Sequence, residues 1–394
     1  MVRNAYGIAR AWLSISRWLN MKNPSLRKSL KKRPGRPTVV AFGGNSFEGL
    51  EQNTAKNIVG MIKSGHFPVI THGNGPQVGE LLIKHPEKSI AECVHMTQVE
   101  MGRQMKDALE QLETGIDVKI IPTRVLVAHN DPAFDNPTKY VGPCYTLKQL
   151  TSGKIGKTRK MHEIGKFKVV RPNGKEWIIK EVSGEKGQYR RVVASPTPLA
   201  IYPEDIAKIS ESIKAGKIVI AVGGGGVAVS QKHFEGYYSE QTEEAVIDKD
   251  LASALLARDL EAKELVISTG VREVALNWGK EEQVNLGYMH AKQALKMLDQ
   301  GHFPTGSMGE KMEAAINALR FGVNTILITH PASDWDRNEG TLLTRGIDLT
   351  GRIKNLTRRK PYELQRWMII REDPRSVPLA SVLDRCSPPR PFQH

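Results

Sequence analysis

The sequence is poor in cysteine and has no long apolar segment. Its 394 residues include three cysteines, and none of them forms a C-x-x-C pair. An odd number of cysteines without such a pair excludes a disulfide framework and a cysteine-based zinc site, and it favours a reducing compartment. No stretch approaches the roughly 20 apolar residues that span a bilayer. The 40% apolar content is enough for a substantial globular core, which excludes collagen-like and wholly disordered chains.

Several common catalytic motifs are also missing. The sequence has no G-x-S-x-G nucleophile elbow, no H-E-x-x-H zinc motif, no P-loop and no dinucleotide-binding fingerprint. His66, His72 and His95 share no metal-ligand spacing. These absences argue against nucleophilic and metal-hydrolytic chemistry and against P-loop and Rossmann folds. We therefore predict no side chains that hold a metal.

Acidic residues are missing from the start of the chain, which has a formal net charge of +15. Residues 1–37 hold ten Lys and Arg and no acid, and residues 346–394 hold ten Lys and Arg and five acids. Residues 38–345 therefore carry no net charge. A basic chain usually suggests nucleic acid or an anionic membrane as partner. Because the excess charge lies at the two ends, we predict no nucleic-acid partner and no membrane span.

Residues 1–37 have the composition of an organelle transit peptide, which is rich in arginine, free of acids and amphipathic. Three arginines recur at seven-residue spacing, and four apolar residues share one helical face: Arg3, Arg10, Arg17, Ile8, Trp12, Ile15 and Leu19. We expect a mitochondrion, a mitochondrion-related organelle or a plastid as destination. The alternatives are a surface-bound or disordered tail on a cytoplasmic protein, or a nuclear signal at residues 31–37. Residues 346–394 have no clear periodicity and predict a partly disordered extension.

Between residues 38 and 345, short apolar runs alternate with segments of helical periodicity. Each run ends in glycine or a small polar residue, and the clearest are residues 38–42, 67–71, 217–222, 265–269 and 325–329. Strands of this length between helices predict βαβ units and a parallel sheet covered on both faces. The sequence therefore predicts an α/β fold whose ligands bind beyond the carboxyl ends of the strands.

Residues 125 to about 191 interrupt this alternation. Two strand-like runs flank Asn173 and Gly174, a dipeptide that favours a tight hairpin turn. Residues 146–191 hold thirteen Lys and Arg against four acids, so this insert is +9 and the rest of residues 38–345 is −9. The basic insert predicts either a solvated face or a lid subdomain over an anionic ligand.

Glycine-rich loops follow three of the expected strands. They are Gly43–Gly44–Asn45, Gly73–Asn74–Gly75 and residues 223–226. Glycine lets backbone N–H groups approach a phosphate or carboxylate closely, and a following helix adds its positive end. One such loop is common, but three in one chain favour phosphate chemistry.

Two lysines occupy positions that local rules do not favour. Ser307 and Glu310 have capping-box spacing, which predicts a helix start near Ser307 and places Lys311 in the first turn, where the helix dipole disfavours a cation. Lys249 lies between two aspartates at the entry to another expected helix. Each is either a solvated surface lysine or a functional one. Lysines beside anion-binding loops suit phosphoryl transfer, in which positioning and charge neutralisation provide most of the catalysis.

The ordered set of these motifs resembles the carbamate kinases of the amino acid kinase superfamily. The resemblance runs from about Val39 to Thr341, and its most specific segments are HGNGPQVG, NPTK-x-x-GP, EAVIDKDLA and GSM-x-x-K. It implies a three-layer α/β/α fold with a mostly parallel eight-stranded sheet, a small protruding subdomain and a homodimer. The implied reaction is reversible transfer between carbamoyl phosphate plus ADP and carbamate plus ATP, with Mg²⁺ bound to the nucleotide. The implied direction is ATP formation in arginine catabolism.

The resemblance also implies roles for individual residues. Lys139 would reach the phosphate from the subdomain, Lys249 would bridge oxygens of the transferred phosphoryl group, and Asp250 would orient the lysines. The residues implied to surround the phosphoryl and carbamoyl groups are Gly43, Gly44, Asn45, Gly73, Asn74 and Gly75. The residues implied to bind the nucleotide are Lys311, Gly223, Gly224, Ser307 and Met308.

Other kinases of this superfamily resemble one another in a lysine two residues before the first glycine pair, where this chain has Ala41. Ala41 matches the carbamate kinases, whose lid lysine takes over that role. The chain departs from the family pattern at residues 46–47, at residues 91–102 and at Glu310. Two alternatives stay open: a superfamily kinase that acts on another small carboxylate or phosphate, and a catalytically silent homologue.

Overall fold

The computed structural model describes residues 37–43 and 51–345, apart from residues 114, 163–164, 172–173, 183–184, 235–236, 305–306 and 336–338. The predicted transit peptide, except for Pro37, and the predicted C-terminal extension lie outside the described residues. So do Gly44, Asn45 and Asn173. Within the described residues, no helix has the length and apolarity needed to cross a membrane.

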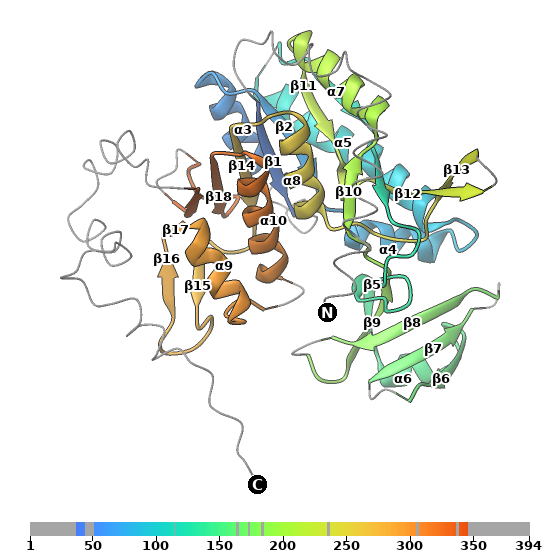
Figure 1. Ribbon diagram of the computed structural model, residues 1–394. Helices are drawn as coiled ribbons and strands as arrows, with labels where there is room; N and C mark the ends of the chain where they lie inside the picture. Colours follow the sequence, from blue (N-terminus) through green and yellow to red (C-terminus); the bar gives the residue numbers. More distant parts are fainter. Residues whose placement is uncertain are drawn as a thin grey trace.

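An eight-stranded sheet forms the centre of the molecule (Figure 1). Its order is β17 (Tyr288–His290), β19 (Thr341–Thr344), β18 (Thr325–Thr329), β14 (Glu264–Ser268), β1 (Thr38–Phe42), β2 (Pro68–His72), β11 (Ile218–Ala221) and β3 (Val118–Ile121). Every neighbouring pair is parallel except β18 and β19. The five strands predicted from apolar runs are all present, within one residue at either end. The α/β class and the eight-stranded, mostly parallel sheet are confirmed.

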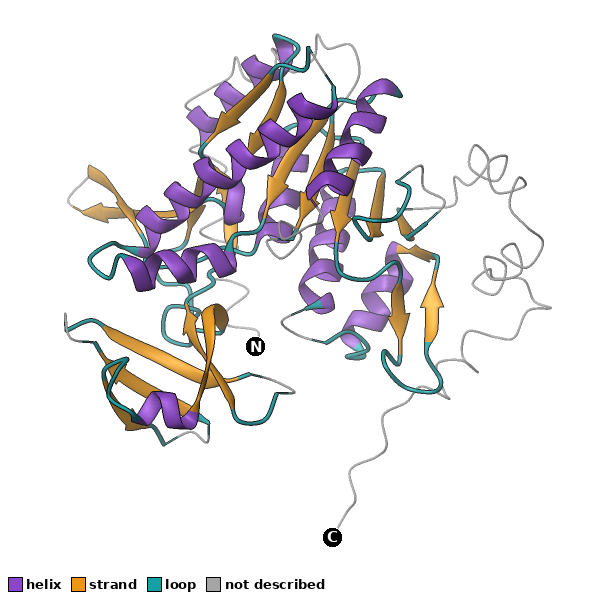
Figure 2. Ribbon diagram, turned by 180° about the vertical axis from the view of Figure 1, so that it is seen from behind, coloured by secondary structure: helices purple, strands orange, loops and turns teal. Residues whose placement is uncertain are grey.

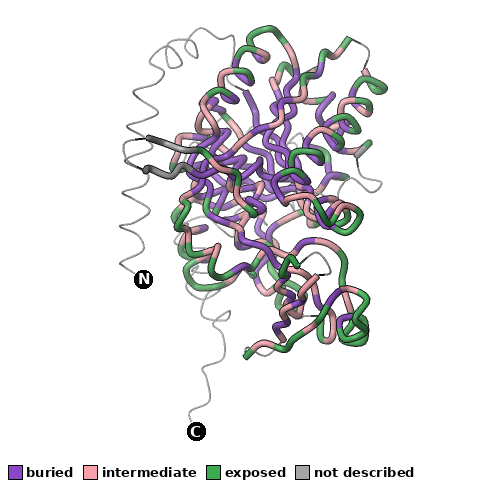
Figure 3. The backbone as a smooth tube through the Cα atoms, turned by 90° about the vertical axis from the view of Figure 1, so that its right-hand side faces the viewer, coloured by how far each residue is buried: buried purple, intermediate pink, exposed green. Residues whose placement is uncertain are grey.

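Helices cover both faces of this sheet, as Figure 2 shows. Alternate residues of β1 point to opposite faces: Val39 and Ala41 belong to one core cluster, and Val40 and Phe42 to another. The first cluster includes α7 (Pro203–Lys214), α8 (Lys249–Asp259), α9 (Ala291–Asp299) and α10 (Met308–Phe321). The second includes α3 (Glu51–Lys63) and α5 (Ile90–Leu112). Because both faces are covered, the central strands are buried along their length (Figure 3) and their sequences read as continuous apolar runs.

A five-stranded antiparallel sheet forms a lid below the main body in Figure 1. Its order is β5 (Lys139–Thr146), β9 (Gln188–Val193), β8 (Glu176–Glu181), β7 (Lys166–Val170) and β6 (Lys157–Lys160), with α6 (Leu147–Thr151) against it. The predicted hairpin is present, because β7 and β8 pair up to Val170 and Glu176. The lid has its own apolar core around Trp177 and Phe167.

The predicted insert begins at residue 125, but its first strand belongs to a different sheet. This strand, β4 (Arg124–Val127), lies in a four-stranded sheet with β10 (Pro198–Ile201), β12 (Val227–Phe234) and β13 (Tyr237–Thr242). The five-stranded lid itself runs from Lys139 to Val193.

The lid meets the body at a close backbone contact between α4 (Gly75–Lys84) and β5. A Cβ atom added to Gly79 would lie 1.9 Å from the Cα atom of Gly142. Gly142 itself has a φ of +73°, a conformation that glycine adopts without strain. Both glycines are therefore required where the helix passes over the lid strand.

We predict that Gly79→Ala destabilises the protein by about 1–3 kcal/mol, because the added methyl group overlaps a backbone that cannot move alone. Gly60→Ala is the matched control: Gly60 also lies in a helix, but its added Cβ would have no neighbour within 4 Å. The control should stabilise the helix by about 0.5–1 kcal/mol. Chemical denaturation followed by circular dichroism measures both changes. Equal changes in the free energy of unfolding for the two variants would show that the α4–β5 contact is not tight.

Candidate active site

A cavity of about 130 Å³ lies where the glycine-rich loops meet the lid. Its walls come from the loop after β2, the first strand of the lid, the turn after β11 and the N-terminal ends of α8 and α10. The lining residues are Gly73, Asn74, Gly75, Lys139, Tyr140, Gly224, Val246, Ile247, Asp248, Lys249, Asp250 and Lys311. The fold thus brings together eight of the predicted site residues. As the sequence predicted for an α/β fold, the cavity lies beyond the carboxyl ends of parallel strands.

Glycine at position 224 is a steric requirement of this cavity. A Cβ atom there would lie 2.0 Å from the side-chain nitrogen of Asn74, and the φ of Gly224 is +62°. Asn74 cannot swing aside freely, because its Nδ2 donates a hydrogen bond to Oγ1 of Thr97 at 2.7 Å. The turn after β11 can therefore reach the loop after β2 only without a side chain.

Asp248 directly precedes α8 and is the N-cap residue of that helix. Its Oδ1 accepts hydrogen bonds from the backbone N–H groups of Asp250 at 2.9 Å and Leu251 at 3.2 Å. The predicted helix entry is confirmed. Lys249 is not a solvated surface lysine, since its side chain is only 12% exposed and pairs with the carboxylate of Asp250.

Asp250 joins the two lysines that the sequence singled out. Its Oδ1 contacts Lys249, its Oδ2 accepts a hydrogen bond from Nζ of Lys311 at 3.1 Å, and its side chain is 2% exposed. Burial alone would raise the pKa of Asp250, but the two ammonium groups hold it well below its ordinary value. Burial also lowers the pKa of Lys249, an effect that Asp250 opposes and Lys311 reinforces. The triad therefore holds a carboxylate that stays ionised between two cations.

Lys139 enters the cavity from the lid. Its Nζ donates a hydrogen bond to Oδ2 of Asp248 at 2.6 Å. The cavity thus gathers three lysines and two aspartates from three places in the fold: β5, α10, and α8 with its N-cap residue Asp248. An excess of ammonium groups in a partly buried site is suited to a multiply charged anion.

The helix predicted near Ser307 begins there, but the predicted capping box is wrong. Ser307 precedes α10, yet its side chain makes no capping hydrogen bond. The backbone carbonyl of Pro304 accepts from the N–H of Gly309 at 2.8 Å instead. The charge of Glu310 acts on Lys139 and Glu313. Lys311 is tolerated in the first turn because Asp250 neutralises it.

Four other predicted residues do not line the cavity. Gly43 directly follows β1. The backbone carbonyl of Phe42, the last residue of β1, accepts a hydrogen bond from the N–H of Gly73 at 2.9 Å. Gly223 lies against His72, and Ser307 and Met308 lie at the start of α10. Burial lowers the pKa of His72 to about 4, so this histidine is neutral at pH 7.

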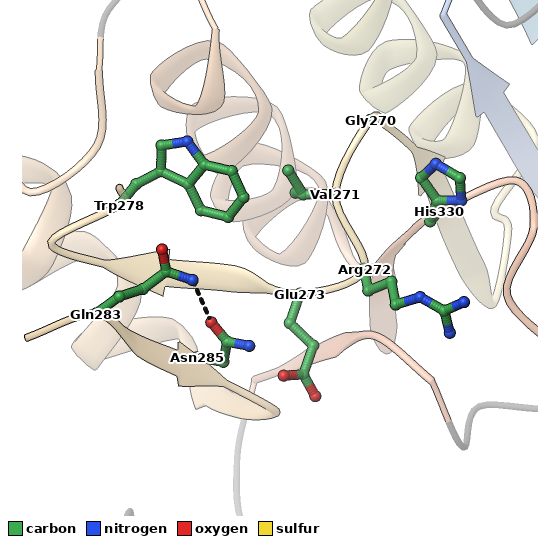
Figure 4. Close-up of a pocket in the computed structure, with 8 residues that line it drawn as sticks. All are labelled: Gly270, Val271, Arg272, Glu273, Trp278, Gln283, Asn285 and His330. Atoms are coloured by element: carbon green, nitrogen blue, oxygen red, sulfur yellow. Dashed lines mark hydrogen bonds between the residues drawn. The ribbon is translucent and has the colours of Figure 1, made fainter. Parts of the chain in front are cut away.

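A second cavity, of about 370 Å³, was missed by the sequence analysis (Figure 4). It lies beside the loops after β14 and β18 and the hairpin of β15 (Val274–Leu276) and β16 (Val284–Leu286), and its lining residues are Gly270, Val271, Arg272, Glu273, Trp278, Gln283, Asn285 and His330. Trp278 is 57% exposed, an unusual position for a large aromatic side chain. The glycine after the strand at residues 265–269 was the available signal, because it marks the same edge of the sheet as the other glycine loops.

Comparisons with known proteins agree with this geometry. The model of the amino acid kinase family matches residues 36–330. Carbamate kinase 3 of Staphylococcus aureus is 37% identical over 327 residues, which cover 78% of this chain and 97% of the relative. The carbamate kinase of Pyrococcus furiosus is 37% identical over 325 residues, which cover 75% and 94%.

Solved structures with this fold include carbamate kinase from Giardia lamblia. The form bound to citric acid has a TM-score of 0.65 at 29% identity, and the form bound to AMP-PNP has a TM-score of 0.62 at 29% identity. Each match covers 79% of this chain and 99% of the Giardia chain. With its fold, its lysine-rich cavity and these relatives, the chain belongs to the amino acid kinase family and, within it, to the carbamate kinases.

Proposed function

We propose that this protein transfers a phosphoryl group between carbamoyl phosphate and ADP, giving carbamate and ATP, and that ATP formation is its direction in arginine catabolism. The observation that carries the proposal is the convergence of Lys139, Lys249 and Lys311 on one cavity beside glycine-rich loops. The names of the relatives support the choice of carbamoyl phosphate. Ala41, the last but one residue of β1, supports it as well, because the lysine typical of other family kinases is missing there.

The proposed mechanism depends on charge and position. The terminal oxygen of ADP attacks already ionised, and carbamate leaves as an anion, so no group must remove a proton. No histidine in the described part of the chain lines the cavity, which is consistent with a site that uses no general base. Lys249 and Lys139 would neutralise oxygens of the transferred phosphoryl group, Lys311 would neutralise the nucleotide phosphates, and Asp250 would hold Lys249 and Lys311 in place.

Mg²⁺ would enter as part of the nucleotide substrate. Both aspartates in the cavity are engaged: Asp248 by a helix end and Lys139, and Asp250 by two lysines. Among the described residues, no group of three or more His, Cys, Asp or Glu side chains could hold a metal ion. These residues therefore fit an ion that is held by phosphate oxygens and water, as Mg²⁺ commonly is.

The nucleotide base would lie in the cavity beside Trp278. This cavity lies by the loops after β14 and β18. In the sheet, β14 pairs with β1 and β18 pairs with β14, and all three strands are parallel, so both cavities lie along one edge. Lys311 would then meet the phosphates between them. Stacking of an aromatic base on the exposed ring of Trp278 would stabilise ADP without contacting the reacting groups.

Lys249→Ala is predicted to lower kcat/KM for ATP formation from ADP and carbamoyl phosphate by about 100- to 1,000-fold, because it removes a cation from developing charge in a buried site. A coupled assay of ATP measures the loss. The assignment of roles fails if the variant keeps substantial activity. Trp278→Ala is the comparison variant. It should raise the KM for ADP and leave kcat unchanged.

The same assay separates the alternatives. Turnover of acetylglutamate or UMP, with none of carbamoyl phosphate, would identify a kinase of different substrate. Nucleotide-dependent thermal stabilisation without any turnover would identify a silent homologue.

Asp250→Asn is predicted to destabilise the protein by about 3 kcal/mol at pH 7, because it leaves two ammonium groups buried without their carboxylate. The folded state lowers the pKa of Asp250, so its stabilising contribution is present above the unfolded value near 4 and is lost as the pH falls. The difference between wild type and variant should therefore shrink between about pH 5 and pH 2. Urea denaturation across this range measures it, and a constant difference would contradict the prediction.

We further propose a homodimer, which the relationship to carbamate kinases supports, and an organellar location, which the composition of residues 1–37 supports. Residues 1–37 fused to a fluorescent reporter should direct it to a mitochondrion, a mitochondrion-related organelle or a plastid. Replacing Arg3, Arg10 and Arg17 by glutamine should release the reporter into the cytoplasm. A reporter that stays cytoplasmic with the native segment would refute the targeting proposal.

A further inference from the structure

The two carboxylate oxygens of Asp248 accept hydrogen bonds from two different parts of the molecule. Oδ1 accepts the backbone N–H groups of Asp250 and Leu251 at the start of α8, and Oδ2 accepts Nζ of Lys139 from the lid. We infer that Asp248 is a positioning residue that fixes the lid lysine relative to the catalytic helix. This inference rests on the proposed phosphoryl transfer, in which Lys139 contacts the phosphate.

Lys139 needs such a partner because of its own flexibility. A lysine has a four-carbon stem and three rotatable N–H donors, so an unpaired one samples many positions. The side chain of Lys139 is 36% exposed, which leaves it room to turn away from the cavity. The hydrogen bond to Asp248 takes one donor and leaves two for a phosphate.

The carboxylate of Asp248 is itself fixed. Its side chain is 11% exposed, and two backbone N–H groups of α8 hold Oδ1. The next residue along the chain, Lys249, is the proposed bridging lysine. Asp248 thus adjoins both lysines: it accepts a hydrogen bond from Lys139 and directly precedes Lys249 in the chain. The two lysines lie 110 residues apart in the sequence.

The ion pair also keeps Lys139 charged. Burial lowers the pKa of Lys139, but Asp248, with smaller contributions from Asp250 and Glu310, more than offsets this and raises the pKa above its ordinary value. The lid lysine therefore enters the reaction as a cation.

The lid has other attachments that do not involve the cavity. Nζ of Lys175, in the turn between β7 and β8, donates to the backbone carbonyls of Glu87 at 3.2 Å and Lys88 at 3.0 Å. None of these three residues lines the cavity. Lys175→Ala therefore removes a contact between lid and body without touching the site, which makes it a matched control.

Asp248→Asn tests the inference, because asparagine keeps a capping oxygen but loses the charge opposite Lys139. We expect kcat for ATP formation to fall roughly 10- to 100-fold, the value of a hydrogen bond to a charged group. The KM for carbamoyl phosphate should change much less, because the contact acts in the transition state. Lys175→Ala should keep the wild-type kcat.

A double-mutant cycle separates positioning from a structural role. In a Lys139→Ala background, Asp248→Asn should have almost no further effect on kcat, because the inferred effect of Asp248 runs through its hydrogen bond with Lys139. An undiminished effect in that background would overturn the inference. So would an Asp248→Asn single variant that keeps the wild-type kcat.

A second readout needs no turnover. Acetic anhydride labels neutral amines, so acetylation of Lys139, measured by mass spectrometry, should increase in Asp248→Asn while that of Lys175 stays constant. Unchanged labelling of Lys139 would overturn the inference. A wild-type protein that is inactive with carbamoyl phosphate but shows the labelling change would instead refute the proposed function and keep the link between Asp248 and Lys139.

Discussion

The buried carboxylate of Asp250 is the constraint on which the site depends. Two ammonium groups, those of Lys249 and Lys311, belong to largely buried side chains, and buried cations without a counter-ion are unfavourable. Asp250 makes their burial possible, and Asp248 does the same for Lys139. Because three lysines face two aspartates, the side chains of the cavity have an excess of positive charge that a phosphate would neutralise. Stability without substrate and affinity for substrate therefore arise from the same five side chains.

Much of the fold could be predicted from local patterns. Apolar runs such as residues 38–42 predicted the central strands, because strands buried on both faces leave no polar alternation. The lid hairpin followed from the turn around residues 173–174. Burial of Lys249 could not be predicted, since spacing places a lysine at a helix start but does not show what covers it. The pair of Lys139 and Asp248 was equally inaccessible, because 109 positions separate them and only the lid topology brings them together.

The failures have specific physical causes. The capping box at Ser307 was wrong because a backbone carbonyl, that of Pro304, accepts a hydrogen bond from Gly309 in the first turn of α10, and this contact needs no particular side chain. The cavity at Trp278 was missed because its residues come from several loops without a shared periodicity. The sequence showed that the lid is basic, but it did not show how the lid accommodates so many positive charges. Arg171 and Arg191 lie over the ring of Trp177, at 4.3 and 4.5 Å, so part of the charge stabilises the lid core.

The contact between Gly79 and Gly142 has a mechanical consequence. Helix α4 starts at Gly75 in the wall of the cavity, and one turn later it touches β5 of the lid, three residues after Lys139. The two backbones contact each other directly, so no side chains lie between α4 and β5 at this point. The lid is consequently not a free flap, because its first strand lies directly against the helix whose first residue lines the cavity. The strand that carries Lys139 therefore has its position fixed by the same helix that begins in the cavity wall.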